Sequence, residues 1–408
     1  MLKGFRYQIY PNFEQTVLCE KHFGCARIVY NMGLEIKQSA YKSFGKNVTY
    51  NELAGELSDL KEGFPFFKEV NSQSLQASLK NLDTAYQNFF KYKRGFPKFK
   101  KKHNKQTFHC PQNVETDFEK GKIILPKFKE PIQCEFHKKF NGKIKNGTIS
   151  KTPSGKYFVS ILVDTNEPIQ LKRIIKEETT TGIDLNLKDT VVLSDGTKFV
   201  NPKILSLYEN KLKWLQHNFA RMKIGSKRRE RMRLRIARVY EKIANCRKDF
   251  LHKTSDAITK RDDTFCMEDL AVSNMMKNHK LAKAIADASW GELKRQISYK
   301  AEWRGKSILL CDRFDATTKT CSCCSLKNES ITLQDRLWIC PFCFAGHDRD
   351  INAAINIKQF ALNNFWQMER LRHDAEVLPL PSVKKPKGKR AIEASKIQDS
   401  VEPLVPYC

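Results

Sequence analysis

The chain has 408 residues, 40% of them hydrophobic, which is enough for two or more domains that each bury a core. It has 73 Lys and Arg against 45 Asp and Glu, a formal net charge of +28 spread along the chain, which favours nucleic acid as a partner over a merely basic soluble protein. Because no apolar run approaches the ~20 residues of a membrane-spanning helix, and the N-terminus lacks a signal-peptide region, we expect no membrane partner and a cytoplasmic protein.

The first 104 residues predict one strand followed by three helices. Residues 3–10 alternate as a strand, and apolar residues recur at helical spacing over residues 13–43, 50–60 and 74–95. Thr49 is a typical N-cap for the second helix. The next segment, residues 95–105 (GFPKFKKKHNK), interleaves rings with lysines, which suits a loop that grips a nucleic-acid backbone.

Residues 106–166 predict an antiparallel β-domain, because short alternating runs are broken by Gly, Pro and Asn-Gly. The strand at residues 3–10 is expected to belong to the same sheet. The sequence thus predicts a small β-barrel with a helical insertion, followed by a connector over residues 165–178.

A different domain begins near residue 179. The apolar strand at 182–185 contains Asp184, and Asp195-Gly196 predicts a hairpin turn into the next strand. Residues 203–260 predict a basic helical hairpin that breaks at 223–226. The excess of arginine over glutamate favours a nucleic-acid-facing helix there over a merely solvated face.

The last part of this domain alternates strands and helices. A short strand at 264–267 ends in Glu268, residues 280–303 are helical, and residues 307–311 form another strand. After the cysteine-rich segment, Asp350 opens an apolar helix that ends near Leu371. Residues 373–408 are polar and contain prolines, so they are predicted to be a disordered tail.

Two Cys-x-x-Cys pairs, Cys321/Cys324 and Cys340/Cys343, are separated by fifteen residues, the spacing of a zinc ribbon. Four thiolates leave no open position, so a structural Zn²⁺ is expected; two disulfides or idle thiols are the alternative. Cys323 could replace Cys324 as a ligand. The intervening residues 331–340 can form the hairpin that joins the two pairs.

Three acids occupy comparable places: Asp184 on a first strand, Glu268 at the end of a later strand, and Asp350 at the start of a late helix. This order is similar to an RNase H-type α/β core, in which three carboxylates converge on two Mg²⁺ ions, with Mn²⁺ as a substitute. Asp348 is the rival of Asp350 for the third position, and His347 and Arg349 are either assistants or structural residues.

The ordered set of GIDLNLKD, the strand ending in Glu268, ASWGELKRQISYKAEWRG, the two cysteine pairs and HDRDINAAINI resembles the TnpB (OrfB) family of transposon-encoded, RNA-guided DNA endonucleases, relatives of type V CRISPR effectors. The resemblance covers roughly residues 3–372. Four positions depart from the family. His109 and Cys110 stand where relatives can have Thr-Asn. Ser325 and Phe344 follow the cysteine pairs where relatives usually have glycine, so each turn lacks its most permissive residue.

The resemblance implies a multidomain fold. It consists of a wedge β-barrel (1–12 and 105–170), a helical recognition insert (13–104), a RuvC-like nuclease (179–312 and 346–372) and a zinc-ribbon target-nucleic-acid-binding insert (313–345).

The same resemblance implies catalytic, Mg²⁺-binding roles for Asp184, Glu268 and Asp350. Tyr50 and Gln76 match positions that touch a short motif beside the target. The implied partners are a guide RNA from the transposon end and target DNA, both double-stranded and as the displaced single strand. The protein is expected to be a monomer with its RNA in a prokaryotic cytoplasm, at the nucleoid when on target.

Two alternatives remain. A transposase that performs strand transfer usually orders its acids Asp, Asp, Glu, whereas this chain has Asp, Glu, Asp. A non-cleaving RNA-guided DNA-binding protein would have lost its acids, and the three acids here are intact.

Overall fold

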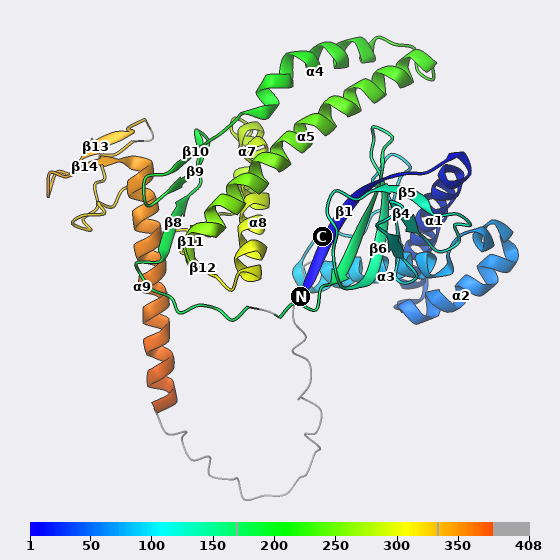
Figure 1. Ribbon diagram of the computed structural model, residues 1–408, viewed down its shortest axis with the longest axis horizontal. Helices are drawn as coiled ribbons and strands as arrows, with labels where there is room; N and C mark the ends of the chain where they lie inside the picture. The colour runs from blue at the N-terminus through cyan, green and yellow to red at the C-terminus, as the bar shows by residue number, and fades with distance from the viewer. Residues whose placement is uncertain (169, 333, 378–408) are drawn as a thin grey trace, which may run out of the picture. The chain divides into compact units, whose positions relative to one another are not determined.

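A computed structural model describes residues 1–168, 170–332 and 334–377, so most of the predicted tail lies outside the described residues (Figure 1). The chain divides into two compact units. The first comprises Met1–Pro168 with Asn218–Arg238, and the second comprises the rest, so that the division falls within a long helical hairpin. No helix in these described ranges is long and apolar enough to cross a membrane.

The first unit combines a seven-stranded antiparallel sheet with three helices. The strand order is β2-β6-β7-β1-β5-β4-β3, so β1 lies inside the sheet, as predicted for the first strand. The pairings leave β2 and β3 at the two ends of this order, and closure into a barrel remains a prediction. The strands are β1 Leu2–Tyr10, β2 Gln106–Cys110, β3 Glu115–Asp117, β4 Lys122–Ile124, β5 Ile132–Glu135, β6 Lys143–Lys151 and β7 Tyr157–Asp164.

The three helices between β1 and β2 confirm the predicted helical segment. They are α1 Phe13–Phe44, α2 Tyr50–Gly63 and α3 Ser72–Tyr92, with a short 3-10 helix at Pro65–Glu69. The predicted cap is present, since the Thr49 hydroxyl accepts the N–H of Glu52 and the Glu52 carboxylate accepts the N–H of Thr49. Phe23 of α1 packs against the sheet, whereas Leu34, also of α1, packs with α2 and α3.

The second unit is built on a five-stranded sheet of order β10-β9-β8-β11-β12. β8 (Thr180–Asp184), β11 (Thr264–Glu268) and β12 (Ser307–Cys311) are parallel, and β9 (Asp189–Leu193) and β10 (Lys198–Val200) extend the sheet antiparallel. Asp195-Gly196 makes the predicted turn between β9 and β10. The remaining helices are α4 Ile204–Ala220, α5 Lys227–Arg261, α6 Val272–Met275, α7 Ala282–Ala288, α8 Trp290–Trp303 and α9 Arg349–Val377. The end of α4 and the start of α5 belong to the first unit, and the rest belong to the second.

The residues of β11 show why helices cover both faces of this sheet. Successive side chains of a strand point to opposite faces. Phe265 and Met267 pack with residues of α5 and α8, while Cys266 between them packs with Ile357 and Ala361 of α9. The parallel strands are therefore buried on both sides, and their apolar runs need no alternation.

Two predicted helices differ most from the structure. The segment 280–303 is broken at Ser289, whose left-handed φ of 52° ends α7 and begins α8. This break lets Ala288 and Trp290 enter one buried cluster, a change of direction that helical periodicity does not reveal. α9 continues to Val377, so residues 373–377 are helical and the predicted disorder there is wrong.

Substitution of Gly182 tests the packing of α9 on β8. A Cβ at Gly182 would lie 1.9 Å from the carbonyl oxygen of Ala354, so Gly182→Ala forces the helix away from the strand. We expect a loss of about 1–3 kcal/mol, the usual cost of overpacking, measured by urea unfolding of the full chain.

The control is Gly291→Ala on α8, where nothing lies within 4 Å of the added Cβ. It should be neutral or stabilising by up to ~1 kcal/mol, because alanine favours a helix. Equal stabilities of the two variants would contradict the close contact at Gly182.

Candidate active site and metal centre

Asp184 and Glu268 stand at the same edge of the second sheet. β8 and β11 are parallel neighbours, and Ile183 is the Cα partner of Met267. The acids follow this pair directly, at the carboxyl ends of their strands. Because neighbouring strands are about 4.8 Å apart, the two carboxylates lie within reach of one another.

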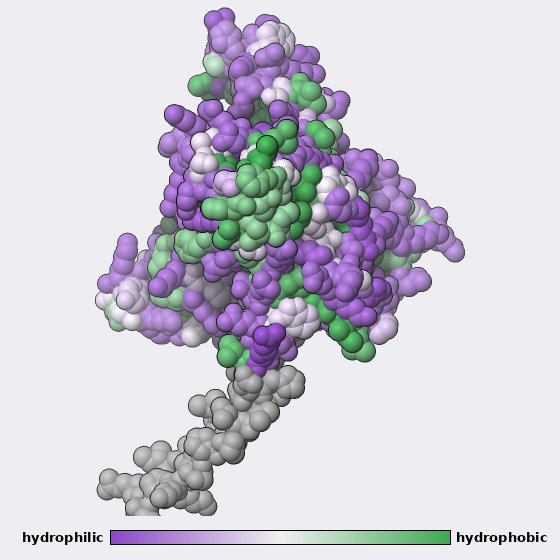
Figure 2. Space-filling model, turned by 90° about the vertical axis from the view of Figure 1, so that its left-hand side faces the viewer, coloured by the Kyte–Doolittle hydropathy of each residue, from purple (hydrophilic) through white to green (hydrophobic). Residues whose placement is uncertain are grey.

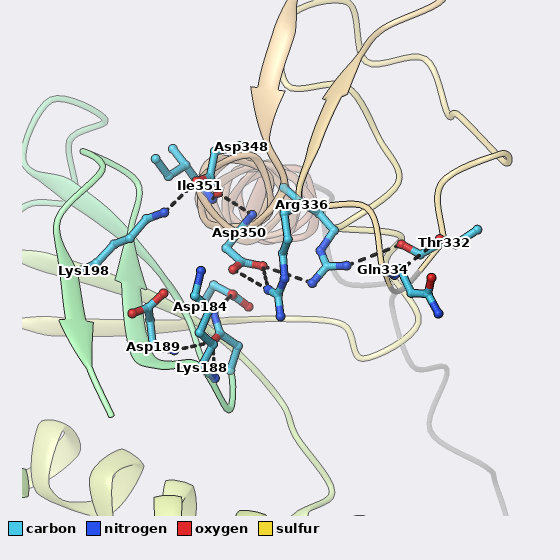
Figure 3. Close-up of polar contacts among 12 residues, drawn as sticks. Asp184, Lys188, Asp189, Lys198, Thr332, Gln334, Arg336, Asp348, Asp350 and Ile351 are labelled. Carbon is cyan, nitrogen blue, oxygen red and sulfur yellow. Dashed lines mark hydrogen bonds and ion pairs between the residues drawn. The ribbon is translucent and has the colours of Figure 1, made fainter. Parts of the chain in front are cut away.

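Asp350 reaches the same edge from the first turn of α9. Figure 3 shows its carboxylate next to Asp184, with Arg336 beside it. The Arg336 guanidinium donates to Asp350 Oδ2 at 2.9 Å and to Oδ1 at 3.3 Å, and Arg349 Nη2 lies 3.5 Å from Oδ1. Asp350 is 7% exposed. The structure thus brings together the three acids that the sequence singles out.

The electrostatics of this edge reflect crowding of negative charge. Burial, then the charges of Glu268 and Asp350, raise the pKa of Asp184 to about 7, against a hydrogen bond from Asn186 that lowers it. Burial also raises the pKa of Glu268, while the Thr317 hydroxyl, which donates to Glu268 Oε1 at 2.8 Å, opposes that shift. A cation would relieve this repulsion, and three carboxylates are the hard oxygen donors that fit Mg²⁺ or Mn²⁺.

Asp348 has a different task from Asp350. Its Oδ1 accepts the backbone N–H groups of Asp350 at 3.0 Å and Ile351 at 3.3 Å, so it caps α9. Its other oxygen pairs with Lys198 Nζ at 2.6 Å (Figure 3). The Asp348 carboxylate is therefore committed to the helix start, which leaves Asp350 as the acid that faces Asp184.

The four predicted cysteines form one cluster. The sulfurs of Cys321, Cys324, Cys340 and Cys343 all lie within 4.8 Å of one another, with 3.6 Å between Cys321 and Cys343 and 3.7 Å between Cys324 and Cys340. This donor set fits a structural Zn²⁺. Cys323 is outside it and groups instead with Cys321 and His347, whose Nε2 lies 3.1 Å from the Cys321 sulfur.

The hairpin of this ribbon is not where the sequence placed it. β13 (Leu337–Ile339) pairs with β14 (Gly346–Asp348), on the far side of the second cysteine pair. The prediction of a hairpin within residues 331–340 is wrong. The Cys340–Cys343 pair itself lies in the connection between β13 and β14, and this turn has no Asn-Gly signal in its sequence.

Both cysteine pairs are followed by a residue in the left-handed region. Ser325 has φ of 61° and Phe344 has φ of 59°. Their N–H groups donate to the carbonyls of Cys321 at 2.9 Å and Cys340 at 3.0 Å, which closes each turn. A left-handed conformation costs a residue with a Cβ about 1–2 kcal/mol. Glycine would adopt this conformation without that cost.

The ribbon also presents apolar side chains to solvent. They are Leu326, Leu337, Ile339, Phe342 and Phe344, each at least half exposed. Figure 2 views the structure from the side on which β13 and β14 lie in Figure 1, and shows a hydrophobic area within a mostly hydrophilic face.

Two buried asparagines, missed in the sequence, attach the ribbon to α9. Asn352 accepts the N–H of Ser322 at 2.9 Å and donates to the Thr320 carbonyl at 2.8 Å. Asn356 donates to the carbonyls of Thr317 at 2.7 Å and Thr320 at 2.6 Å. Their spacing of four places both on one helix face, which was a usable signal in INAAIN. Nothing local marks Arg336 or Thr317.

Tyr50 and Gln76 lie in the first unit. Tyr50 is the first residue of α2, half-buried against the cluster that joins α1, α2 and α3. Gln76 is exposed on α3. Their assignment to nucleic-acid binding stays a prediction.

Comparisons with known proteins agree with this organisation. Residues 160–279 match the OrfB_IS605 family model, "Probable transposase", and residues 290–357 match "Cas12f1-like, TNB domain". Residues 1–46 match a "Helix-turn-helix domain" of the OrfB group, although in this structure they contain β1 and the single helix α1.

Two curated relatives align with most of the chain. A Streptomyces pristinaespiralis protein named "Putative RNA-guided DNA endonuclease" is 34% identical over 87% of this chain and 88% of its own length. InsQ of Escherichia coli (strain K12), which bears the same description, is 30% identical over 87% of this chain and 91% of its own length. The solved Cas12f1-sgRNA-target DNA complex has a TM-score of 0.48 at 14% identity, covering 88% of this chain and 98% of that one, too distant to define the fold.

Fold and site define the class as a mixed α/β protein with converging carboxylates and an inserted, zinc-ribbon-like cysteine cluster. With such relatives along most of its length, the chain belongs to the TnpB (OrfB) family.

Relief of the left-handed strain in the ribbon is testable. Phe344→Gly should stabilise the ribbon by about 1 kcal/mol, because glycine adopts this φ without the Cβ clash. Limited proteolysis within residues 313–348 should slow, while the zinc content of the purified protein stays the same. Cys340→Ser is the opposite control, since removal of a thiolate should lower zinc content and speed cleavage. A Phe344→Gly ribbon that is cut faster would contradict the strain.

The raised pKa of Asp184 predicts how stability depends on pH without Mg²⁺. An unfolded aspartate releases its proton near pH 4, whereas folded Asp184 keeps it to about pH 7. The fold should therefore lose stability as the pH rises from about 4 through 7. Asp184→Asn should raise Tm at pH 8 more than at pH 5, in Mg²⁺-free buffer.

The exposed Glu302→Gln should show no such difference between the two pH values, and Mg²⁺ at pH 8 should stabilise the wild type but not Asp184→Asn. The same Tm change at both pH values would show that Asp184 is not buried among like charges.

Proposed function

We propose that this chain is an RNA-guided DNA endonuclease of an insertion sequence, with a RuvC-type, Mg²⁺-dependent nuclease site at Asp184, Glu268 and Asp350. The observation that carries the proposal is the convergence of three acids from β8, β11 and α9 in a family whose relatives carry this activity in their names.

Two Mg²⁺ ions held by these carboxylates would supply a water nucleophile and stabilise the leaving oxygen of an in-line phosphodiester cleavage. The chain's own residues orient the site. Arg336 holds the Asp350 carboxylate, and because its side chain is 46% exposed, its other N–H donors can meet a phosphate. Thr317 holds one oxygen of Glu268 and leaves the other for a ligand.

The remaining assignments follow from the family. Residues 1–12 and 105–170 would form a wedge barrel and residues 13–104 a recognition insert, with Tyr50 and Gln76 at the motif beside the target. Residues 313–345 would contact target nucleic acid, and 179–312 with 346–372 would cut it. Support for guide RNA and target DNA as partners comes from the net charge of +28 and the lysine-rich segment 95–105.

The test begins with the RNA that copurifies when the chain is expressed with its flanking DNA. We expect one abundant RNA that ends in a variable guide segment, and Mg²⁺-dependent cleavage of DNA that matches this guide. Glu268→Gln should abolish cleavage and preserve RNA and DNA binding, since it removes a metal ligand without changing side-chain shape. The exposed Glu302→Gln on α8 is the matched control and should cleave normally.

Loss of DNA binding together with cleavage in Glu268→Gln would show that Glu268 is structural. Full cleavage in the same variant would show that Glu268 is not needed for catalysis.

A strand-transfer enzyme is the second candidate, favoured by the family model whose description is "Probable transposase". It predicts joined rather than merely cut products when transposon-end DNA is supplied, and no requirement for a defined RNA.

A further inference from the structure

The second unit contains a cavity of about 790 Å³ that is separate from the carboxylates. It lies between the connector after residue 170, the start of β12 and the second half of α9; Figure 1 shows this connector running past α9. Lys172, Ile174, Ser307, Trp366 and Arg370 are among its lining residues. A volume of this size is typical of a ligand site. We call it the connector cleft.

The connector cleft is at the opposite edge of the sheet from the three acids. Ser307 begins β12, whereas Cys311 at the other end of β12 pairs with Glu268. Trp366 is sixteen residues after Asp350 on α9, or about 24 Å at 1.5 Å per residue. A molecule in the cleft therefore occupies a different place from the strand that is cut.

The wall formed by the connector is fixed. The N–H of Arg173 donates to the Gly305 carbonyl at 3.0 Å, and its guanidinium pairs with Asp263 at 2.6 Å. Gly305 has φ of 63°, and a Cβ there would lie 2.6 Å from the carbonyl oxygen of Leu171. These contacts hold the segment against the turn before β12, so the cleft is pre-formed.

The chemistry of the lining selects a particular occupant. Trp366 is 42% exposed and Ile174 is 79% exposed, which provides flat and apolar surface. Lys172 and Arg370 are exposed and have no ion pair among the described residues, whereas the acid of the lining, Glu369, is paired with Arg372 at 2.9 Å. Two available cations beside an exposed ring fit a single-stranded nucleic acid, whose phosphates and bases they match.

Charge argues against the chain's own C-terminal segment as the occupant, because residues 383–390, VKKPKGKR, are themselves basic. DNA that is to be cut must reach the other edge of the sheet. We propose that the connector cleft binds an unpaired segment of the guide RNA, with a base on Trp366 and phosphates on Lys172 and Arg370. This inference rests on the proposed function.

The test uses the full chain and the RNA that copurifies with it, transcribed with 4-thiouridine. Irradiation should attach this RNA to the peptide that contains Trp366. Trp366→Ala should weaken RNA affinity about 5- to 150-fold, the range expected for loss of one stacked base, and Trp366→Phe should restore most of it. The double variant Lys172→Glu/Arg370→Glu should weaken RNA binding. It should also make the slope of log affinity against log salt concentration shallower by about 1.4, near 0.7 for each lost phosphate contact.

The matched control is Lys277→Glu/Lys280→Glu, which changes charge equally at two exposed lysines of the same unit that line no part of the cleft. It should retain more of the RNA affinity than the cleft variant. Thermal melting of each variant verifies folding, and a destabilised Trp366→Ala is replaced by the charge variants.

The outcomes separate the two proposals. If no defined RNA copurifies, the proposed function itself fails. A defined RNA that binds every cleft variant with wild-type affinity, and whose crosslinks lie elsewhere, refutes the cleft alone. Crosslinking of Trp366 to a single-stranded DNA oligonucleotide, but not to the RNA, would overturn RNA as the occupant. Equal losses of RNA affinity in the cleft and control double variants would show that only the net charge of the protein matters, and would contradict the cleft.

Discussion

The close approach of α9 to β8 at Gly182 is the contact on which the site depends. Because glycine has no Cβ, the helix backbone at Ala354 can lie directly on the strand. That approach brings the first turn of α9, with Asp350, to the edge where Asp184 ends β8. Any side chain at Gly182 would separate the helix from the strand, and with it the third acid from the first.

The same helix anchors the ribbon. Asn352 and Asn356 are each 1% exposed, and their side chains form hydrogen bonds with the backbone of residues 317–322. A buried amide without these partners would lower the stability of the fold. Separation of the ribbon's first turn from α9 is therefore unfavourable. That segment also contains Thr317, which holds Glu268. The two asparagines therefore connect the cysteine cluster to the second acid.

Much of this arrangement was visible in the sequence. The strands and helices of both units, the Thr49 cap and the cysteine spacing follow from periodicity, capping and ligand geometry, all of which are local. What failed depended on context. The break at Ser289 arises because its neighbours both enter one buried cluster, and the β13–β14 pairing surrounds a turn that cysteine ligands define. Arg336 was missed because its contact with Asp350 exists only after the ribbon folds.

The ribbon contributes contacts to two of the three acids. Asp184 and Glu268 end two strands of one sheet, and their mutual repulsion is fixed by that sheet alone. Asn186 and Arg349 lower the pKa of Asp184. The ribbon contacts the other two acids: the Thr317 hydroxyl, before the first cysteine pair, donates to Glu268, and Arg336, before the second, pairs with Asp350. A metal ion on the four thiolates would order the ribbon and so help to place Thr317 and Arg336. The cysteine cluster itself does not contact the acids in these interactions. A change in the ribbon's fold would nevertheless alter the contacts of two of the three carboxylates, Glu268 and Asp350.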